Sequence, residues 1–297
     1  MRRPTSLALL WFAVTGSAAA QNFDTVTVRV VPISQGIAML VGAGGNLAVS
    51  WGKDATFVVD DQYAPLTEKI RAAIATLTAN PVRFVLNTHY HGDHTGGNEN
   101  LGKAGALIVA HDKVRVRMSS GQISRVFNRS VPASPTGALP VVTFTETVTF
   151  HLNGDEIQAF HVPPGHTDGD AVVWFKRSNV MHMGDLYFKD RYPFIDVDSG
   201  GDVEGVIGAA GRVLGMIDDN TKVIPGHGAL SNKAELTRYR DMLVVARDRV
   251  KKLIAEGKTL DQITAAKPLA DYDTTWGTGF INPQIFLRLL YVSLGGK

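Results

Sequence analysis

The fold is decided by one short stretch, His89-Tyr90-His91-Gly92-Asp93-His94. Four of these six residues can coordinate a metal ion, and three are histidines although the whole chain has only nine. Residues 81–88, just upstream, form an apolar, β-prone run that predicts a buried strand. The sequence therefore predicts a metal-binding loop at the end of a strand, where a rigid element holds the side chains in place.

The spacing within the loop suggests two metal positions. His89 and His91 are two residues apart, so in extended backbone both side chains point the same way and can bind one ion. Asp93 and His94 follow Gly92, where the chain turns freely, and can face a second ion. Imidazoles with a carboxylate suit Zn²⁺, and suit Fe or Mn less selectively. The alternative is a polar loop that is histidine-rich by chance.

Three further strands are predicted to end in residues of the ligand type. His166, Asp185 and His227 each follow a glycine just after a predicted strand. Taken singly, each has an ordinary alternative as a loop histidine or a strand-terminating aspartate. Together with the first loop, they can converge only if these strand ends share one edge of a two-sheet core.

The N-terminus has the pattern of a secretory signal peptide. A basic start, the short apolar run of residues 7–14 and Ala18-Ala19-Ala20 predict export with cleavage after Ala20, to the periplasm or outside the cell. A retained anchor is the alternative, although the run is too short to span a bilayer. No other stretch is long and apolar enough to cross a membrane. Residues 21–297 are expected to form a single domain.

Charge and cysteine content narrow the partners. Loss of residues 1–20 removes two arginines and no acids, so the mature chain would carry 28 basic and 28 acidic residues. Without a basic field we expect no nucleic-acid partner. The absence of cysteine excludes disulfides and thiolate ligands.

The remaining pattern predicts alternating strands and helices. Strands are expected at residues 25–31 and 143–150, with a type I′ turn at Asn153-Gly154. Helices are expected at residues 64–79, 112–126, 203–217, 232–256 and 283–293. Residues 130–140 hold three prolines and predict a surface loop at a possible edge of the site.

Several residues near the predicted ligands are open to two interpretations. Asp60 or Asp61 could orient a metal-bound histidine or cap a helix. Tyr187 and Phe194 could line a pocket or belong to the core. Lys189 or Arg191 could pair a substrate carboxylate or be solvated. Trp276 and Phe280 could cover the pocket or anchor a C-terminal helix.

The ordered motifs His-x-His-x-Asp-His, Gly-His-Thr, Gly-Asp and Gly-His resemble those of the metallo-β-lactamase-fold hydrolase superfamily, over roughly residues 25–295. This resemblance implies an α/β fold, a four-layer αββα sandwich. It implies that His89, His91 and His166 bind a first zinc ion. It also implies that Asp93, His94 and His227 bind a second, and that Asp185 bridges the two.

The resemblance further implies a hydrolase in which zinc-activated water attacks a carbonyl, with Asp93 as the catalytic carboxylate. The expected substrate is a small β-lactam-like cyclic amide or a related acyl compound. β-Lactamases proper usually have cysteine or serine where Asp185 stands, so a thioesterase of the glyoxalase II type or a lactonase is the alternative. An iron-dependent oxidoreductase of the same fold is a third possibility. The oligomeric state is not predicted.

Overall fold

The computed structural model describes residues 22–296, so the predicted signal peptide lies outside the described residues. The strands of this part form a seven-stranded sheet, a six-stranded sheet and a separate two-stranded hairpin. In spatial order the first contains β1 (Arg29–Ser34), β2 (Ile37–Val41), β3 (Leu47–Trp51), β4 (Thr56–Val59), β5 (Val82–Asn87), β6 (Leu107–His111) and β9 (Val142–Phe144). The second contains β10 (Thr147–Leu152), β11 (Asp155–His161), β12 (Ala171–Phe175), β13 (Val180–His182), β14 (Lys222–Ile224) and β15 (Ser231–Asn232).

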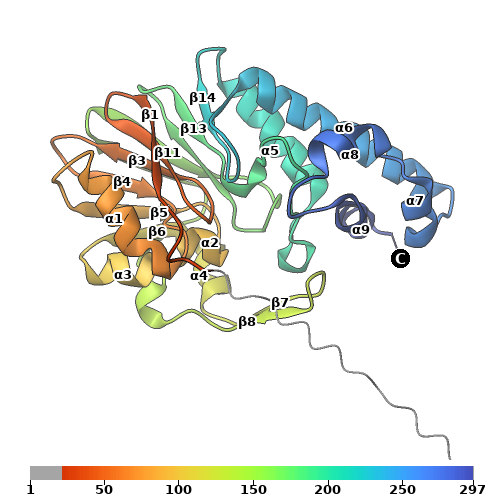
Figure 1. The fold of residues 1–297 in the computed structure, drawn as a ribbon, viewed down its shortest axis with the longest axis horizontal. Helices are drawn as coiled ribbons and strands as arrows, with labels where there is room; N and C mark the ends of the chain where they lie inside the picture. The colour runs from red at the N-terminus through yellow and green to blue at the C-terminus, as the bar shows by residue number, and fades with distance from the viewer. Residues whose placement is uncertain (1–21, 297) are drawn as a thin grey trace, which may run out of the picture.

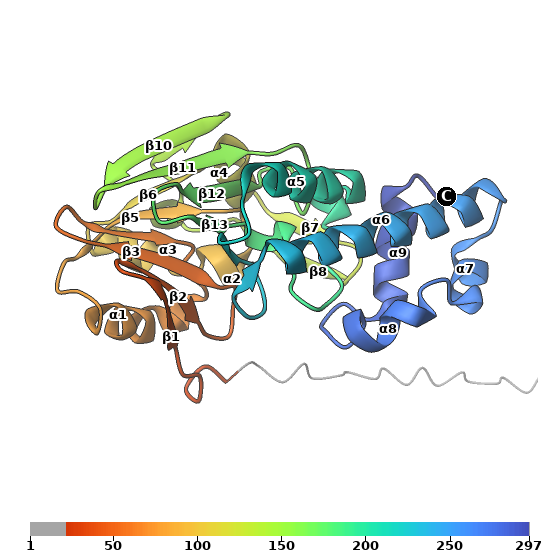
Figure 2. The same cartoon turned by 90° about the horizontal axis from the view of Figure 1, so that it is seen from above.

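Helices cover the outer faces of both sheets (Figures 1 and 2). Those before the second sheet are α1 (Thr67–Ala75), α2 (Gly92–Thr95), α3 (Asn98–Lys103) and α4 (Asp112–Met118). Those after it are α5 (Val203–Met216), α6 (Lys233–Ala255), α7 (Leu260–Ala266), α8 (Ala270–Trp276) and α9 (Pro283–Ser293). Short 3₁₀ turns occupy Ala64–Leu66, Thr136–Ala138, Gly184–Leu186 and Val197–Ser199. The predicted αββα sandwich is confirmed.

The core between the sheets is built from alternate strand residues of both. Phe57 of β4 packs edge-on against Phe150 of β10 and Phe175 of β12, with ring centroids 4.9 and 6.3 Å apart. Burial of a side chain of this size contributes about 1.5–3 kcal/mol. This layer fixes the distance between the two sheets, and hence between the loops at their shared edge.

Each outer face has its own apolar layer. Ile70 and Ile74 of α1 pack against the outward residues of β2, β3 and β4. On the other side, Val206 of α5 and Leu236 of α6 pack against Val172 of β12 and its neighbours. These apolar positions repeat at helical spacing, which is why the helices at 203–217, 232–256 and 283–293 were predictable. No described helix has the length and hydropathy that crossing a membrane requires.

Three element predictions are corrected. The helix expected over residues 112–126 ends at Met118, and the chain then forms a β-hairpin of β7 (Gln122–Ser124) and β8 (Arg129–Val131). The expected strand 143–150 is two strands, β9 and β10, one in each sheet. The first strand begins at Arg29 rather than Thr25. The Asn153-Gly154 turn is confirmed, with φ of +55° and +75° at the two residues.

Asn46, in the turn between β2 and β3, joins the two sheets at the edge that carries the ligand loops. Its buried side-chain nitrogen donates to the carbonyls of Pro225 and Gly228, each at 2.9 Å. Its backbone nitrogen donates to the carbonyl oxygen of Gly226 at 2.7 Å, and its own carbonyl oxygen lies 3.0 Å from Nε2 of His182. The loop after β14 is therefore attached to the first sheet.

We predict that Asn46→Ala lowers the free energy of unfolding by about 1–3 kcal/mol, because the buried carbonyl of Pro225 and the partly buried carbonyl of Gly228 lose their donor. Urea denaturation followed by circular dichroism measures this. Asn220→Ala is the control, because this asparagine is exposed before β14 and its side chain makes no hydrogen bond within residues 22–296, so stability should change by less than about 0.5 kcal/mol. Equal effects of the two substitutions would contradict the role assigned to Asn46.

Candidate metal centre

The strand directions bring the seven predicted residues to one edge. In the first sheet β4, β5 and β6 run parallel, so Asp60 and the loop 88–94 leave the same end. In the second, β13 and β14 are parallel to each other and β11 has the same direction, because β12 is antiparallel to both β11 and β13. The loops that follow β11, β13 and β14 carry His166, Asp185 and His227 at that edge.

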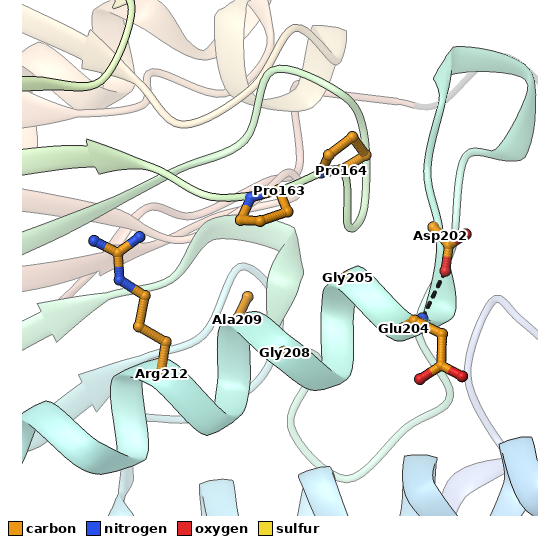
Figure 3. Close-up of a pocket in the computed structure, with 8 residues that line it drawn as sticks. All are labelled: Pro163, Pro164, Asp202, Glu204, Gly205, Gly208, Ala209 and Arg212. Carbon is orange, nitrogen blue, oxygen red and sulfur yellow. Dashed lines mark hydrogen bonds between the residues drawn. The ribbon is translucent and has the colours of Figure 1, made fainter.

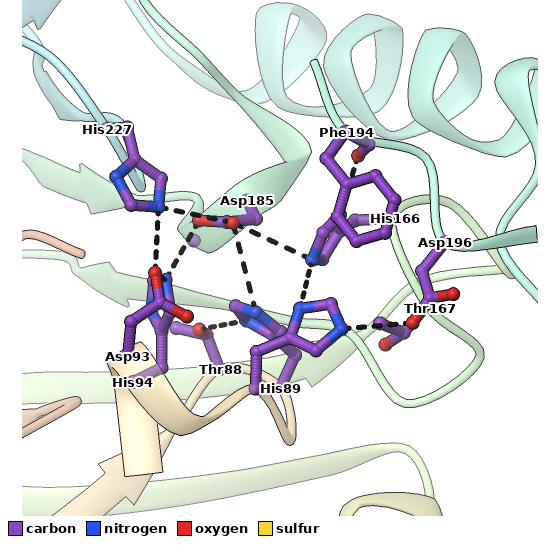
Figure 4. Close-up of polar contacts among 12 residues, drawn as sticks. Thr88, His89, Asp93, His94, His166, Thr167, Asp185, Phe194, Asp196 and His227 are labelled. Carbon is purple, nitrogen blue, oxygen red and sulfur yellow. Dashed lines mark hydrogen bonds and ion pairs between the residues drawn. The ribbon is translucent and has the colours of Figure 1, made fainter. Parts of the chain in front are cut away.

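The side chains form two adjacent clusters (Figure 4). One contains His89, His91, His166 and Asp185, and the other contains Asp93, His94 and His227. Within each cluster, one donor atom per residue lies within 4.8 Å of the donor atoms of the others. The structure thus brings together every residue that the sequence predicted as a ligand.

Asp185 lies between the clusters. Its Oδ1 is 3.0 Å from His94 Nε2, and its Oδ2 is 3.4 Å from His227 Nε2. The same Oδ2 is 3.6 Å from His166 Nε2 and 3.9 Å from His89 Nε2. One carboxylate therefore faces nitrogen atoms of both clusters, which is the position a bridging ligand needs.

Three of these inward atoms, His89 Nε2, His94 Nε2 and Asp185 Oδ1, are buried and make no well-aligned hydrogen bond among the described residues, although the last two lie 3.0 Å apart as an ion pair. A buried polar atom without a partner costs about 1–3 kcal/mol. Coordination to cations would satisfy all three atoms, and imidazole with carboxylate is a donor set that zinc accepts. The residues present therefore fit a divalent metal site.

The first cluster is oriented by contacts on its outer side. His166 Nδ1 donates to the carbonyl of Phe194 at 2.7 Å, which leaves the lone pair of Nε2 directed inward. His91 Nε2 bonds Asp196 at 3.0 Å, and its Nδ1 lies 2.8 Å from His166 Nε2. Partners of this kind fix both the tautomer and the ring orientation of a metal-binding histidine.

A shared carboxylate orients two more rings. Asp60 Oδ2 lies 2.7 Å from His94 Nδ1, and Asp60 also accepts hydrogen bonds from the backbone nitrogen and hydroxyl of Thr88. Because that hydroxyl donates to Asp60, it accepts from His89 Nδ1 at 3.0 Å. Asp61 instead accepts from the backbone of Gly97, at the start of α3. Asp60 therefore has the predicted role of orienting a histidine, and neither aspartate caps the helix that follows the pair.

The ionisation of the cluster suits cation binding. Burial lowers the pKa of His89 and lowers that of His166 to about 4, so both rings are neutral at pH 7. Burial alone would raise the pKa of Asp93, but His94 and His227 hold it at about 2. Burial would also lower the pKa of His227, yet Asp185 and Asp93 raise it to about 9. A bound cation would displace that proton.

Three of the seven ligand-type residues are partly exposed to solvent. The side chains of Asp93 and His227 are each 22% exposed and that of His91 is 18% exposed. Those of His89, His94, His166 and Asp185 are 5% exposed or less. Substrate can therefore reach the centre past Asp93, His227 and His91.

The structure also decides several open alternatives. Tyr187 is core, with its hydroxyl 2.8 Å from that of Ser231, and Trp276 is buried under the C-terminal helices. The Lys189 ammonium is 2.8 Å from Glu235, so it is not free to bind substrate. Phe194 stacks on His91 with ring centroids 5.7 Å apart and lines a pocket beside it. No contact assigns a site role to Arg191.

Sequence reasoning missed Asp196 and Asn46. Asp196 stands in a loop far from any motif, and only its contact with His91 reveals it.

A hollow of about 620 Å³, larger than the pocket beside His91, lies along α5 near Pro163, Pro164 and Arg212 (Figure 3). None of the seven ligand-type residues lines that hollow, so its volume does not indicate the reactive site.

Comparisons with known proteins agree with this geometry. The family model of the metallo-beta-lactamase superfamily matches residues 48–243. The chain belongs to this superfamily. A hydroxyacylglutathione hydrolase of Polaromonas sp. is 30% identical over 182 residues, which are 60% of each chain. A metallo-beta-lactamase type 2 of Bacteroides fragilis is 24% identical over 163 residues, 55% of this chain and 57% of the relative.

Two solved structures show the same fold. A metallo-beta-lactamase from Pontibacter korlensis has a TM-score of 0.61 at 20% identity, covering 73% of this chain and 99% of that one. A sec-alkylsulfatase from Pseudomonas sp. has a TM-score of 0.70 at 16% identity, covering 91% of this chain and 50% of that one. The prediction of a metal-dependent hydrolase is thus confirmed at the level of the superfamily. Since the matches span only about 60% of the hydroxyacylglutathione hydrolase from Polaromonas sp., this chain's own reaction is a matter for proposal.

We predict that Gly226→Ala weakens zinc binding by about 10–100-fold, as loss of a supporting contact does in other metal sites. A Cβ at this position would lie 2.0 Å from Asp185 Oδ1 and 2.6 Å from the backbone of Gly184, so the carboxylate must move. Competition with a fluorescent zinc chelator measures the affinity.

Gly92→Ala is the matched control, because a Cβ there meets nothing within 4 Å although it lies in the loop of ligands. Its zinc affinity should remain that of the wild type. If Gly226→Ala also binds zinc normally, Asp185 is not a ligand in the position described.

Proposed function

We propose that the protein is an exported hydrolase that binds two zinc ions and cleaves an acyl substrate at its carbonyl carbon. The observation that carries this proposal is the single carboxylate of Asp185 facing both clusters, with unpartnered donor atoms around it. His89, His91 and His166 are assigned to one ion, and Asp93, His94 and His227 to the other. Zinc is the metal we expect, and iron or manganese would fit the same donors less selectively.

When bound, zinc lowers the pKa of a coordinated water to about 7 and polarises a carbonyl oxygen. The chain supplies position and charge around that chemistry. Asp93, with a pKa of about 2, is ionised at neutral pH and partly exposed. Its carboxylate is therefore available to accept a hydrogen bond from the attacking water and to orient it. Asp60 and Asp196 keep His94 and His91 in place through the reaction.

Two substrate classes deserve direct comparison. The metallo-beta-lactamase relative favours a β-lactam-like cyclic amide. The hydroxyacylglutathione hydrolases and the aspartate at position 185 favour a thioester. Both reactions add water across a carbonyl and release the leaving nitrogen or sulfur with a proton, so the same centre serves either.

Export is proposed from the N-terminal sequence alone, with mature protein beginning at Gln21 in the periplasm or outside the cell. The partner we expect is a small acyl substrate, and neither a nucleic acid nor a membrane after removal of the signal.

We predict that zinc-loaded protein hydrolyses at least one member of a panel of β-lactam, thioester and lactone substrates, and that removal of metal by a strong chelator abolishes this activity. His91→Ala and Asp93→Ala should lose both the activity and part of the zinc content, because each removes a ligand. His151→Ala is the control, since this histidine is exposed on β10. Full activity of either site variant, or of the metal-free protein, would refute the proposed site.

A further inference from the structure

A pocket of about 170 Å³ lies against the open side of the metal centre. His91, Gly92 and Asp196 form its inner end, and Phe194 forms one wall. The opposite wall is the β7–β8 hairpin, the element that the sequence did not predict. In Figure 1 this hairpin lies at the edge of the molecule beyond both sheets. Substrate bound at the metal centre would contact it.

Aromatic contacts hold the hairpin at this position. Phe127, in its turn, packs against Phe194 with ring centroids 5.2 Å apart and against Phe280 at 5.0 Å. Phe194 in turn stacks on His91. Phe280 is 72% exposed, so this row of rings runs from a metal-binding residue to the surface. An apolar group attached to the substrate carbonyl would find a matching wall there.

Two arginines line the pocket, Arg117 and Arg129, and a third, Arg125, lies on the same hairpin outside the lining; Arg117 and Arg125 are already paired. Arg117 Nε lies 2.6 Å from Asp168, and Arg125 lies 3.4 Å from Asp198. Arg129 lines the pocket and has no carboxylate within ion-pair distance among residues 22–296. Its guanidinium is the cation of the hairpin that remains free to bind an anion.

The charge of Arg129 acts toward the metal centre. Burial raises the pKa of Tyr63 to about 12, Asp93 and Asp185 add to the rise, and Arg129 opposes it. Tyr63 is therefore within electrostatic range of the Arg129 guanidinium and of both carboxylates.

Ser124 supplies a second polar group beside it. Ser124 and Arg129 are directly opposite in the β7–β8 ladder, so their side chains project from the same face of the hairpin. The Ser124 hydroxyl is buried, lines the pocket and has no hydrogen-bond partner among the described residues. A guanidinium and a free hydroxyl side by side match the oxygens of a carboxylate.

We propose that the site selects acyl substrates that carry a carboxylate, which Arg129 and Ser124 bind while an apolar acyl group packs against Phe127 and Phe194. This inference rests on the proposed hydrolase function and narrows its substrate class. Lys189 cannot take this role, because Glu235 and the carbonyl of Leu230 hold its ammonium.

The test uses S-phenylacetyl-thioglycolate and its methyl ester, which differ only in the carboxylate. Hydrolysis adds water to the thioester carbonyl, breaks the C–S bond and releases a thiol, which a thiol reagent detects. The chain has no cysteine, so the enzyme adds no background. Wild type should prefer the acid by about 10-fold or more in kcat/KM, as expected for a charge-assisted hydrogen bond.

Arg129→Gln should reduce that preference by about 10-fold, with the loss in KM for the acid, and Ser124→Ala should reduce it a few-fold. The ratio of acid to ester corrects for any general loss of active protein. Arg125→Gln is the matched control on the same hairpin, where Asp198 already binds the arginine. It should keep the wild-type preference. No preference in the wild type, or an unchanged preference in Arg129→Gln, would overturn the inference.

A binding measurement separates this inference from the hydrolase proposal. Calorimetry of zinc-loaded protein with N-phenylacetylglycine, the amide counterpart of the thioester, needs no turnover. About 10-fold weaker binding to Arg129→Gln than to Arg125→Gln would support the carboxylate site even if no thioester were cleaved. Equal binding to the two variants would contradict it even in an active enzyme.

Discussion

The structure depends on one electrostatic constraint, which is that histidine and aspartate donors from four loops converge in a largely buried space. Within that space, Asp185 and the rings of His89 and His94 present atoms to which the described residues offer no hydrogen bond. Such an arrangement is unfavourable for the chain by itself, because buried polar atoms without partners cost free energy. Cations remove the cost, so metal binding and stability of this edge are expected to be coupled.

The two-sheet core serves that constraint. Parallel strands in each sheet deliver loops to one edge, and the aromatic layer around Phe57 keeps the sheets at a fixed separation. Outer contacts then aim each ring. Asp60, Asp196 and the carbonyl of Phe194 hold the far nitrogens of His94, His91 and His166, so the near nitrogens are directed inward. Catalytic residues are thus positioned by rigid elements although they stand on loops.

The sequence predicted this edge well because its signals are local. The His-x-His-x-Asp-His loop after one strand, and a glycine before His166, Asp185 and His227 after three others, marked all of the ligand-type residues, and the structure brings them together. The β7–β8 hairpin was missed although Ser119-Ser120-Gly121 is a helix-stop signal directly after the end of α4 at Met118, because the polar residues on both sides of it were interpreted as one helix. Asp196 was missed for a related reason, since its importance is a tertiary contact with His91 and no motif surrounds it. Substrate preference, which the hairpin would control, is therefore the property that the sequence conveys least.

The most direct measurement of the central claim is anomalous diffraction at the zinc absorption edge from crystals of the zinc-loaded protein. The account predicts two peaks about 3.5–4 Å apart. One should lie among His89, His91 and His166, the other among Asp93, His94 and His227, and Asp185 should contact both. A single peak away from these residues, or none in protein that hydrolyses its substrate, would contradict the account.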